Sequence, residues 1–187
     1  MAVAVADFNV DGFQDLSIGR PNETGNGDSS AGAVEVIYGT SRGLDGANKQ
    51  TLSQDSAGVN GASERYDRFG SAIAAGDFNR DGFADLAVGV PYEDVGSIRD
   101  AGYVNVIYGS ADGLTSVGDQ GWHQNSSGIR GSAEQGDQFG KALAVGDFDN
   151  DGFVDLAIGV PYEDIGAIRD AGLVSILYGS SRGLTAR

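Results

Sequence analysis

Residues 7–15 read Asp7-Phe8-Asn9-Val10-Asp11-Gly12-Phe13-Gln14-Asp15, and the same pattern returns at residues 77–85 and 147–155, 70 positions apart each time. Each copy places oxygen-bearing side chains at positions 1, 3, 5 and 9 of a nine-residue loop, with glycine at position 6. Alternate side chains of a loop can point inward, and glycine lets the backbone turn sharply, so such a loop can surround a hard cation. Three copies at one fixed period predict three structural repeats, each with one metal-binding loop.

Calcium is the ion that this ligand pattern favours, because an almost all-protein set of oxygen ligands suits Ca²⁺ better than the smaller Mg²⁺. We expect three Ca²⁺ sites per chain, each built from four side chains and the backbone carbonyl at position 7. The predicted ligands are Asp7, Asn9, Asp11, Phe13 and Asp15 in the first loop, Asp77, Asn79, Asp81, Phe83 and Asp85 in the second, and Asp147, Asp149, Asp151, Phe153 and Asp155 in the third.

A plainer interpretation treats each loop as a surface hairpin whose Asp, Asn and Gly residues serve only the turn. That interpretation accounts for the Asp-Gly pair but not for a carboxylate at position 9 in every copy. An EF-hand is excluded because Ile18, Val88 and Ile158 occupy position 12, where that motif has Glu. The spacing of 70 residues likewise excludes tandem nonapeptide β-roll repeats.

The third loop carries Asp149 where the other two carry Asn9 and Asn79. The extra carboxylate predicts tighter calcium binding at this loop. We expect the ions to be structural, because clustered carboxylates repel one another without metal and a filled loop couples binding to folding.

The repeat extends well beyond the loops. Residues 69–115 align without a gap to residues 139–185, and about two-thirds of the positions are identical, which is typical of a repeat architecture. No segment of 10–12 residues has a 3.6-residue period, so helices are not expected. Short apolar runs between turn residues predict four strands in the middle unit, at about 71–76, 84–90, 103–108 and 121–125.

The predicted fold is all-β: β-propeller blades of four antiparallel strands, about three per chain. The chain stops short of three full periods, so the last blade is expected to lack its outer strand. We expect a single repeat array over residues 1–187, with blade repeats at about 1–68, 69–138 and 139–187.

Phe69-Gly70, the Asp77–Asp85 loop and Gly89-Val90-Pro91 occur in an order that resembles the FG-GAP repeat of integrin α-subunit propellers and their bacterial relatives. The resemblance covers essentially the whole chain, although the first copy lacks Phe-Gly. It implies that the calcium loops join the first and second strands of each blade and share one face. It also implies ligand contacts on the opposite face, adhesion or protein or glycan binding, an extracellular or cell-surface location, and a bacterial source.

Composition excludes several classes of protein and site. A net charge of −15 at pH 7 and a pI near 4.1 argue against nucleic acid and anionic membrane surfaces as partners. The absence of cysteine excludes disulfides and thiolate metal sites. No apolar run has the length of a membrane span, and the first residues do not form a signal peptide. Loops of this modest charge suit extracellular calcium levels, so we expect export as part of a longer protein.

Catalysis is not expected. His123 is the only histidine, predicted on the fourth strand beside Trp122, and no nucleophile motif accompanies it. The acidic pairs recur with the repeat, whereas a glycosidase needs one asymmetric pair in a cleft. In the long connection after the second strand, we favour an intra-loop salt bridge from Glu93 or Asp94 to Arg99 over a ligand contact.

Three functions stay open. The first is a calcium-stabilised, non-enzymatic adhesion or binding segment; the second is an accessory module of a secreted hydrolase or lyase; the third is a purely structural, self-assembling repeat, trimmed or engineered. Related propellers usually carry about seven blades, and unpaired strand edges promote aggregation. The chain is therefore expected to be a piece of a larger propeller, or to associate head to tail into a ring.

Overall fold

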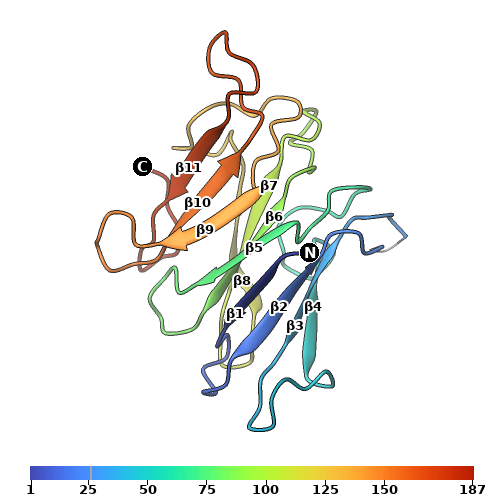
Figure 1. Ribbon diagram of the computed structural model, residues 1–187, viewed down its shortest axis with the longest axis vertical. Coiled ribbons are helices and arrows are strands. Elements are labelled where there is room, and N and C mark those ends of the chain that lie inside the picture. Colours follow the sequence, from blue (N-terminus) through green and yellow to red (C-terminus); the bar gives the residue numbers. More distant parts are fainter. Residues whose placement is uncertain (26) are drawn as a thin grey trace.

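A computed structural model describes residues 1–25 and 27–187, which form three antiparallel sheets of four, four and three strands (Figure 1). The first blade contains β1 (Val3–Ala6), β2 (Asp15–Arg20), β3 (Ala33–Ile37) and β4 (Lys49–Leu52). The middle blade contains β5 (Ala72–Gly76), β6 (Asp85–Val90), β7 (Tyr103–Tyr108) and β8 (Thr115–Trp122). The third blade contains β9 (Ala142–Gly146), β10 (Asp155–Val160) and β11 (Leu173–Leu177).

Each sheet is a meander in which every strand pairs with its neighbour in sequence. The inner strands β1, β5 and β9 lie side by side, with β5 between the other two (Figure 1). The all-β prediction and the incomplete third blade are therefore confirmed. None of the described residues belongs to a helix long and apolar enough to cross a membrane.

The outer strand of the middle blade is longer than predicted and starts earlier. It covers Thr115–Trp122 and pairs with β7 through a register shift, whereas the sequence predicted a strand at 121–125. Its first residues are mostly polar, include glycine and contain only one large apolar residue, Val117, so they carry no apolar run. His123 lies just beyond this strand, and its ring stacks on Tyr103 with 5.7 Å between centroids.

Two apolar clusters hold the blades together. The first joins Val34 and Val36 of β3 to Leu86 and Val88 of β6. The second repeats this arrangement between β7 and β10. Phe69 and Phe139, at the starts of the second and third blades, are fully buried. Burial of apolar area between blades is the main stabilising contribution that this geometry provides.

Glycine allows the blades to approach closely. A β-carbon on Gly89 of β6 would clash with the carbonyl oxygen of Gly140, and one on Gly19 of β2 would clash with that of Gly70. In the third blade the equivalent Gly159 meets only Ala142 of its own sheet. In the first two blades, the glycine two residues before the proline is therefore needed for contact with the next blade and not for the turn.

Candidate metal-binding loops

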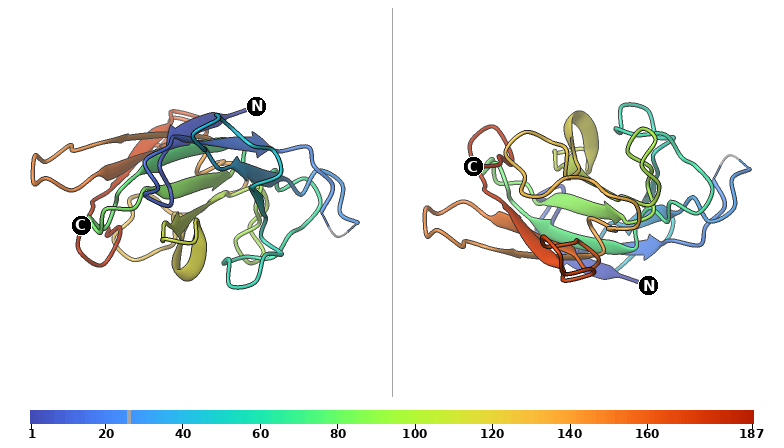
Figure 2. Two further views of the ribbon diagram at one scale, coloured as in Figure 1. Left: turned by 90° about the horizontal axis from the view of Figure 1, so that it is seen from below. Right: turned by 90° about the horizontal axis from the view of Figure 1, so that it is seen from above.

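The three Asp loops join the first and second strands of their blades, and all three lie along the same side of the row of blades (Figure 1). In Figure 2 the third loop (orange) projects from one end of the array, and the connection after β2 (blue) projects from the other. The second and third loops touch, because the Arg80 guanidinium of the second lies 5.5 Å from the ring centroid of Phe153 in the third. This placement agrees with the arrangement that the family resemblance implies.

Backbone hydrogen bonds to the acidic side chains fold each loop. In the second loop the Asp77 carboxylate accepts the N–H groups of Asp81 and Gly82, at 3.1 and 3.0 Å. Asp81 in turn accepts the N–H of Phe83 at 2.9 Å. The same three bonds occur in the other two loops, with distances between 2.9 and 3.1 Å. The side chains at positions 1 and 5 are thereby directed into the loop.

Two residues of each loop adopt the left-handed conformation. Position 6 is glycine as predicted, with φ of +96° at Gly82. Position 4 also has positive φ, at Val10 (+55°), Arg80 (+59°) and Asn150 (+60°). This second left-handed residue was not predictable from the sequence, because only the third loop has a residue type, Asn, that favours the conformation. Val10 is β-branched and therefore strained.

The carboxylate at position 9 lies beneath the loop. Asp85 is fully buried and accepts the N–H of Phe78 at 2.8 Å and that of Gly109 at 2.9 Å. Burial raises the pKa of Asp85 to about 7 and also raises the pKa of Asp15. Each oxygen keeps a second lone pair, so a ligand role for position 9 stays a prediction. What the structure adds is an anchor that ties the loop to the end of the third strand.

Three carboxylates converge in the third loop. Asp147, Asp149 and Asp151 each place one carboxylate oxygen within 4.8 Å of the others. In the second loop the Asn79 carbonyl oxygen accepts the Asp81 N–H at 3.0 Å, and its amide donates to the Asp81 carboxylate at 2.8 Å. Positions 1, 3 and 5 thus present the hard oxygen donors that Ca²⁺ prefers.

Arg187 interacts with the third loop, which the sequence analysis did not foresee. Its guanidinium lies 2.6 Å from the Asp149 carboxylate and 3.5 Å from that of Asp151, and it stacks over the Tyr178 ring. A cation bound by these carboxylates would compete with Arg187. The predicted advantage of the third loop is therefore offset by a resident positive charge.

The predicted salt bridge to Arg99 is wrong. Among residues 1–25 and 27–187, Arg99 forms no ion pair. Glu93 instead accepts a hydrogen bond from the Gln54 amide at 2.7 Å, and Asp94 accepts the Asp100 N–H at 2.9 Å. Burial raises the pKa of Glu93 to about 8. Sequence reasoning missed this contact because Gln54 belongs to the preceding blade.

Comparison with known proteins identifies the same repeat that the sequence shows. The family model described as FG-GAP repeat matches residues 1–37, 69–107 and 139–177. Phosphatidylinositol-glycan-specific phospholipase D of Rattus norvegicus is 36% identical over 181 residues, which is 96% of this chain and 20% of the relative. Integrin alpha-3 of Cricetulus griseus is 32% identical over 188 residues, 100% of this chain and 16% of the relative.

Integrin alpha-6 of Gallus gallus is 30% identical over 176 residues, 93% of this chain and 14% of the relative. The chain thus spans a fifth or less of the length of these relatives. A bacterial source is not borne out by these comparisons. The repeated Asp loops, the Phe-Gly starts and the family match together show that the chain belongs to the FG-GAP repeat family of β-propellers.

Proposed function

We propose that the chain is a calcium-binding, non-catalytic segment of an FG-GAP β-propeller, with one structural ion in each Asp loop. The observation that carries the proposal is the convergence of Asp147, Asp149 and Asp151 oxygens within 4.8 Å, in a loop whose backbone bonds recur in the other two. A bound ion would relieve repulsion among these carboxylates, and binding to the folded loop alone would stabilise the blades.

Isothermal titration calorimetry of the apo protein with CaCl₂ tests the proposal. We expect three Ca²⁺ ions per chain, weaker binding of Mg²⁺, and a thermal midpoint that rises with calcium and falls with chelator. Asp7→Ala, Asp77→Ala and Asp147→Ala should each remove one ion. No saturable heat and an unchanged midpoint would contradict the proposal.

A second titration tests the two opposing charges at the third loop. Asp149→Asn should weaken this site by removing a carboxylate, whereas Arg187→Gln should strengthen it by removing the competing guanidinium. Asn79→Asp is the matched control in the second loop, where no arginine pairs with position 3 among the described residues. Equal calcium affinity in all variants would contradict a ligand role for position 3.

We further propose that the protein acts outside the cell in adhesion or in protein or glycan binding, through the connections after the second strands. The similarity to integrin alpha-3 and the calcium levels that such loops require support this proposal. Arrays of extracellular proteins and glycans, probed with calcium and with chelator, test it. Binding that survives Ile168→Ala and Tyr162→Ala, at two exposed positions of the last connection, would contradict the assigned surface.

The similarity to a phospholipase D favours a second candidate, an accessory module beside a hydrolase domain. The discriminating observation is a catalytic domain in the full-length gene product.

Self-association into a ring is a separate proposal, supported by the exposed apolar faces of the two outer blades. Val3 and Val5 of the first blade are 56% and 58% exposed, and Val174 of the third is 61% exposed. Light scattering over a range of protein concentrations, with calcium and with chelator, tests it. A constant monomer mass would contradict ring closure.

A further inference from the structure

In the described part of the chain, Tyr92 is the one aromatic side chain that contacts two cationic side chains. The Arg68 guanidinium lies 4.7 Å from its ring centroid, and the Lys141 ammonium lies 4.5 Å from the same centroid. Lys141 also donates a hydrogen bond to the Tyr92 hydroxyl at 2.9 Å. The ring therefore holds two like charges close together, at a cost in free energy that an anion would remove.

The three side chains come from separate segments that meet at the junction of the middle and third blades. Arg68 ends the connection into the middle blade, Tyr92 follows β6, and Lys141 directly precedes β9. The Arg68 backbone is fixed, because its N–H donates to the Ser30 carbonyl at 3.1 Å and its carbonyl accepts the Ser71 N–H at 3.0 Å. All three residues are partly exposed, so a small ligand can reach the group.

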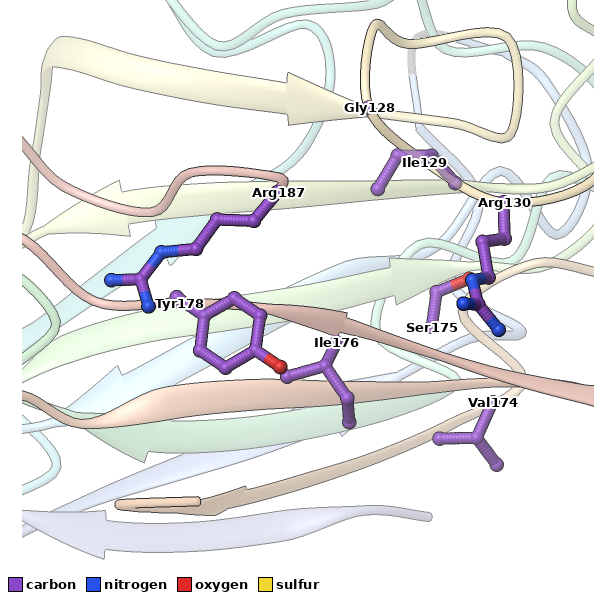
Figure 3. Close-up of a pocket in the computed structure, with 8 residues that line it drawn as sticks. All are labelled: Gly128, Ile129, Arg130, Val174, Ser175, Ile176, Tyr178 and Arg187. Carbon is purple, nitrogen blue, oxygen red and sulfur yellow. The ribbon is translucent and has the colours of Figure 1, made fainter. Parts of the chain in front are cut away.

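No acidic side chain neutralises the two cations. The chain has 27 acidic and 12 basic residues, yet among residues 1–25 and 27–187 neither Arg68 nor Lys141 takes part in an ion pair. The buried Nε of Arg68 has no hydrogen-bond partner there either. Arg187 is a useful contrast: it lies 4.5 Å over the Tyr178 ring, as Figure 3 shows, but it also pairs with Asp149. Stacking on a tyrosine thus leaves a guanidinium free to bind an anionic group.

The acidic residues next to the pair in sequence, Asp67 and Glu93, are engaged elsewhere. The Asp67 carboxylate accepts the N–H of Glu64, and the Glu93 carboxylate accepts the Gln54 amide of the preceding blade at 2.7 Å. Burial raises the pKa of Asp67 to about 7 and that of Glu93 to about 8, and repulsion by Glu64 and Asp94 adds to both rises. At pH 6 both carboxyl groups are therefore mainly protonated and leave the two cations uncompensated.

The repeat shows that blade packing does not require this cluster. One period later, Gln138 stands in place of Arg68, and one period earlier, Asn22 and Ser71 stand in place of Tyr92 and Lys141. The junction of the first and middle blades thus forms without the tyrosine and the lysine. The cluster is a feature of one junction only, which favours a role in binding over a role in folding.

We propose that Arg68 and Lys141 bind one tetrahedral oxyanion group, as in free sulfate or phosphate or in a phosphate monoester. A dianion matches the two positive charges, the guanidinium offers a planar fork of N–H donors, and the ammonium offers a compact charge. The Tyr92 hydroxyl accepts from Lys141 and keeps its own proton for the anion. Tyr92 lies in a connection after a second strand, so the inference rests on the proposed function for its surface and specifies the chemistry of a ligand there.

A two-dimensional ¹H–¹⁵N NMR titration of the intact protein with sodium sulfate at pH 6 tests the site. Sodium chloride keeps the ionic strength constant, and a titration with sodium chloride alone is the blank. We expect saturable shifts of the backbone N–H signals of Arg68, Tyr92 and Lys141. Sulfate also stabilises proteins by exclusion from their surface, but that effect neither saturates nor concentrates at one site. Shifts that do not saturate, or that are spread over the whole surface, overturn the proposal.

The repeat supplies variants that keep the fold. Arg68→Gln and Lys141→Ser each introduce the residue that another blade carries at the same position, and the dispersion of the NMR spectrum reports whether the variant is folded. Each change should weaken sulfate binding about 10-fold, the usual effect of one charge-assisted hydrogen bond. Arg65→Gln is the control, because Arg65 is exposed, lies three residues away and stacks on Tyr66 instead. An equal loss in the control would mean that only net charge matters, and would overturn the site.

Three further probes separate the sources of the anionic group. Tighter binding of glucose 6-phosphate than of inorganic phosphate, with no binding of glucose, assigns the site to a phosphorylated sugar. Equal binding of the two phosphates assigns it to the ion itself. Glucuronate that binds as tightly as sulfate would overturn the choice of a dianion.

The outcome is separable from that of the proposed function. Saturable sulfate binding by a protein that captures no extracellular protein or glycan would refute adhesion and keep the anion site. Capture of such a ligand that Arg68→Gln and Lys141→Ser leave unchanged, together with no saturable sulfate binding, would refute the anion site and keep adhesion.

Discussion

The middle and third blades have nearly the same sequence and very different surfaces. Phe78, at position 2 of the second Asp loop, is fully buried, whereas its equivalent Phe148 is 50% exposed. Val104 of β7 is fully buried, and Val174 of β11 is 61% exposed. The difference comes from the neighbour and not from the residue, because the third blade covers one face of the middle blade. In a repeat protein, burial is therefore a property of the interface between units.

The phenylalanine pair gives the largest expected effect. Phe78→Ala should lower the free energy of unfolding by about 4 kcal/mol, since it leaves a cavity between two blades. Phe148→Ala, with half of its side chain already in solvent, should cost about 1 kcal/mol. Urea denaturation of both variants measures the difference. Equal losses would mean that the blades contribute independently and that the interface adds nothing.

The glycine pair gives the next effect. Gly89→Ala places a methyl group against the carbonyl of Gly140 and should cost about 3 kcal/mol through forced separation of the blades. Gly159→Ala meets only Ala142, whose nearest atom, the β-carbon, lies at 3.3 Å, and should cost about 1 kcal/mol or less. Thermal unfolding of the two variants under one set of conditions compares them. A larger loss for Gly159→Ala would sink the close-approach explanation.

The glutamate at one repeat position is buried in the middle blade, as Glu93, and partly exposed in the first blade, as Glu23. This pair tests how burial by the neighbouring blade changes the pKa of a carboxyl group. The folded-state pKa of Glu93 is raised from its ordinary 4.5 to about 8, because burial disfavours the carboxylate. The folded protein therefore binds this proton more tightly than the unfolded chain does. Ionised Glu93 destabilises the fold at and above pH 8, and the penalty disappears as the pH falls toward 4.5.

Glu93→Gln removes this penalty, so it should raise the free energy of unfolding by about 2 kcal/mol more at pH 8 than at pH 5. The gain is smaller than the pKa shift alone implies, because the surroundings relax around the charge. Glu23→Gln is the control, since Glu23 holds the same repeat position but is partly exposed and pairs with Arg20. Urea titrations from pH 5 to pH 8 report both. A pH profile that Glu93→Gln leaves unchanged would refute the buried-carboxyl explanation.

The smallest effect concerns the turn of the first loop. Val10 has φ of +55°, and the third loop has Asn150 at the same position with φ of +60°. Val10→Asn should stabilise the protein by about 1 kcal/mol, because asparagine tolerates this conformation better than a β-branched residue. The reverse change, Asn150→Val, should destabilise by a similar amount. If the thermal midpoints of both variants moved in the same direction, the explanation by backbone strain at this position would be wrong.

The blade architecture and the Asp loops were predictable because their signals are local. Nine consecutive residues define each loop, and the period of 70 defines the repeat. Contacts between residues far apart in the sequence were not predictable in this way. Gln54 meets Glu93 across 39 positions, and Arg187 meets Asp149 across 38. The start of strand β8 was misplaced because it is set by the pairing of Thr115 with Tyr108 of β7 and by a register shift, neither of which the local sequence shows.

The two glycine contacts between blades, Gly19 with Gly70 and Gly89 with Gly140, are near copies of one another. Each fixes the rotation from one unit to the next without reference to the units before or after. The geometry therefore contains a rule for adding a blade but no count of blades. A genome that duplicates or deletes one 70-residue segment changes the size of the assembly in a single step and needs no new interface.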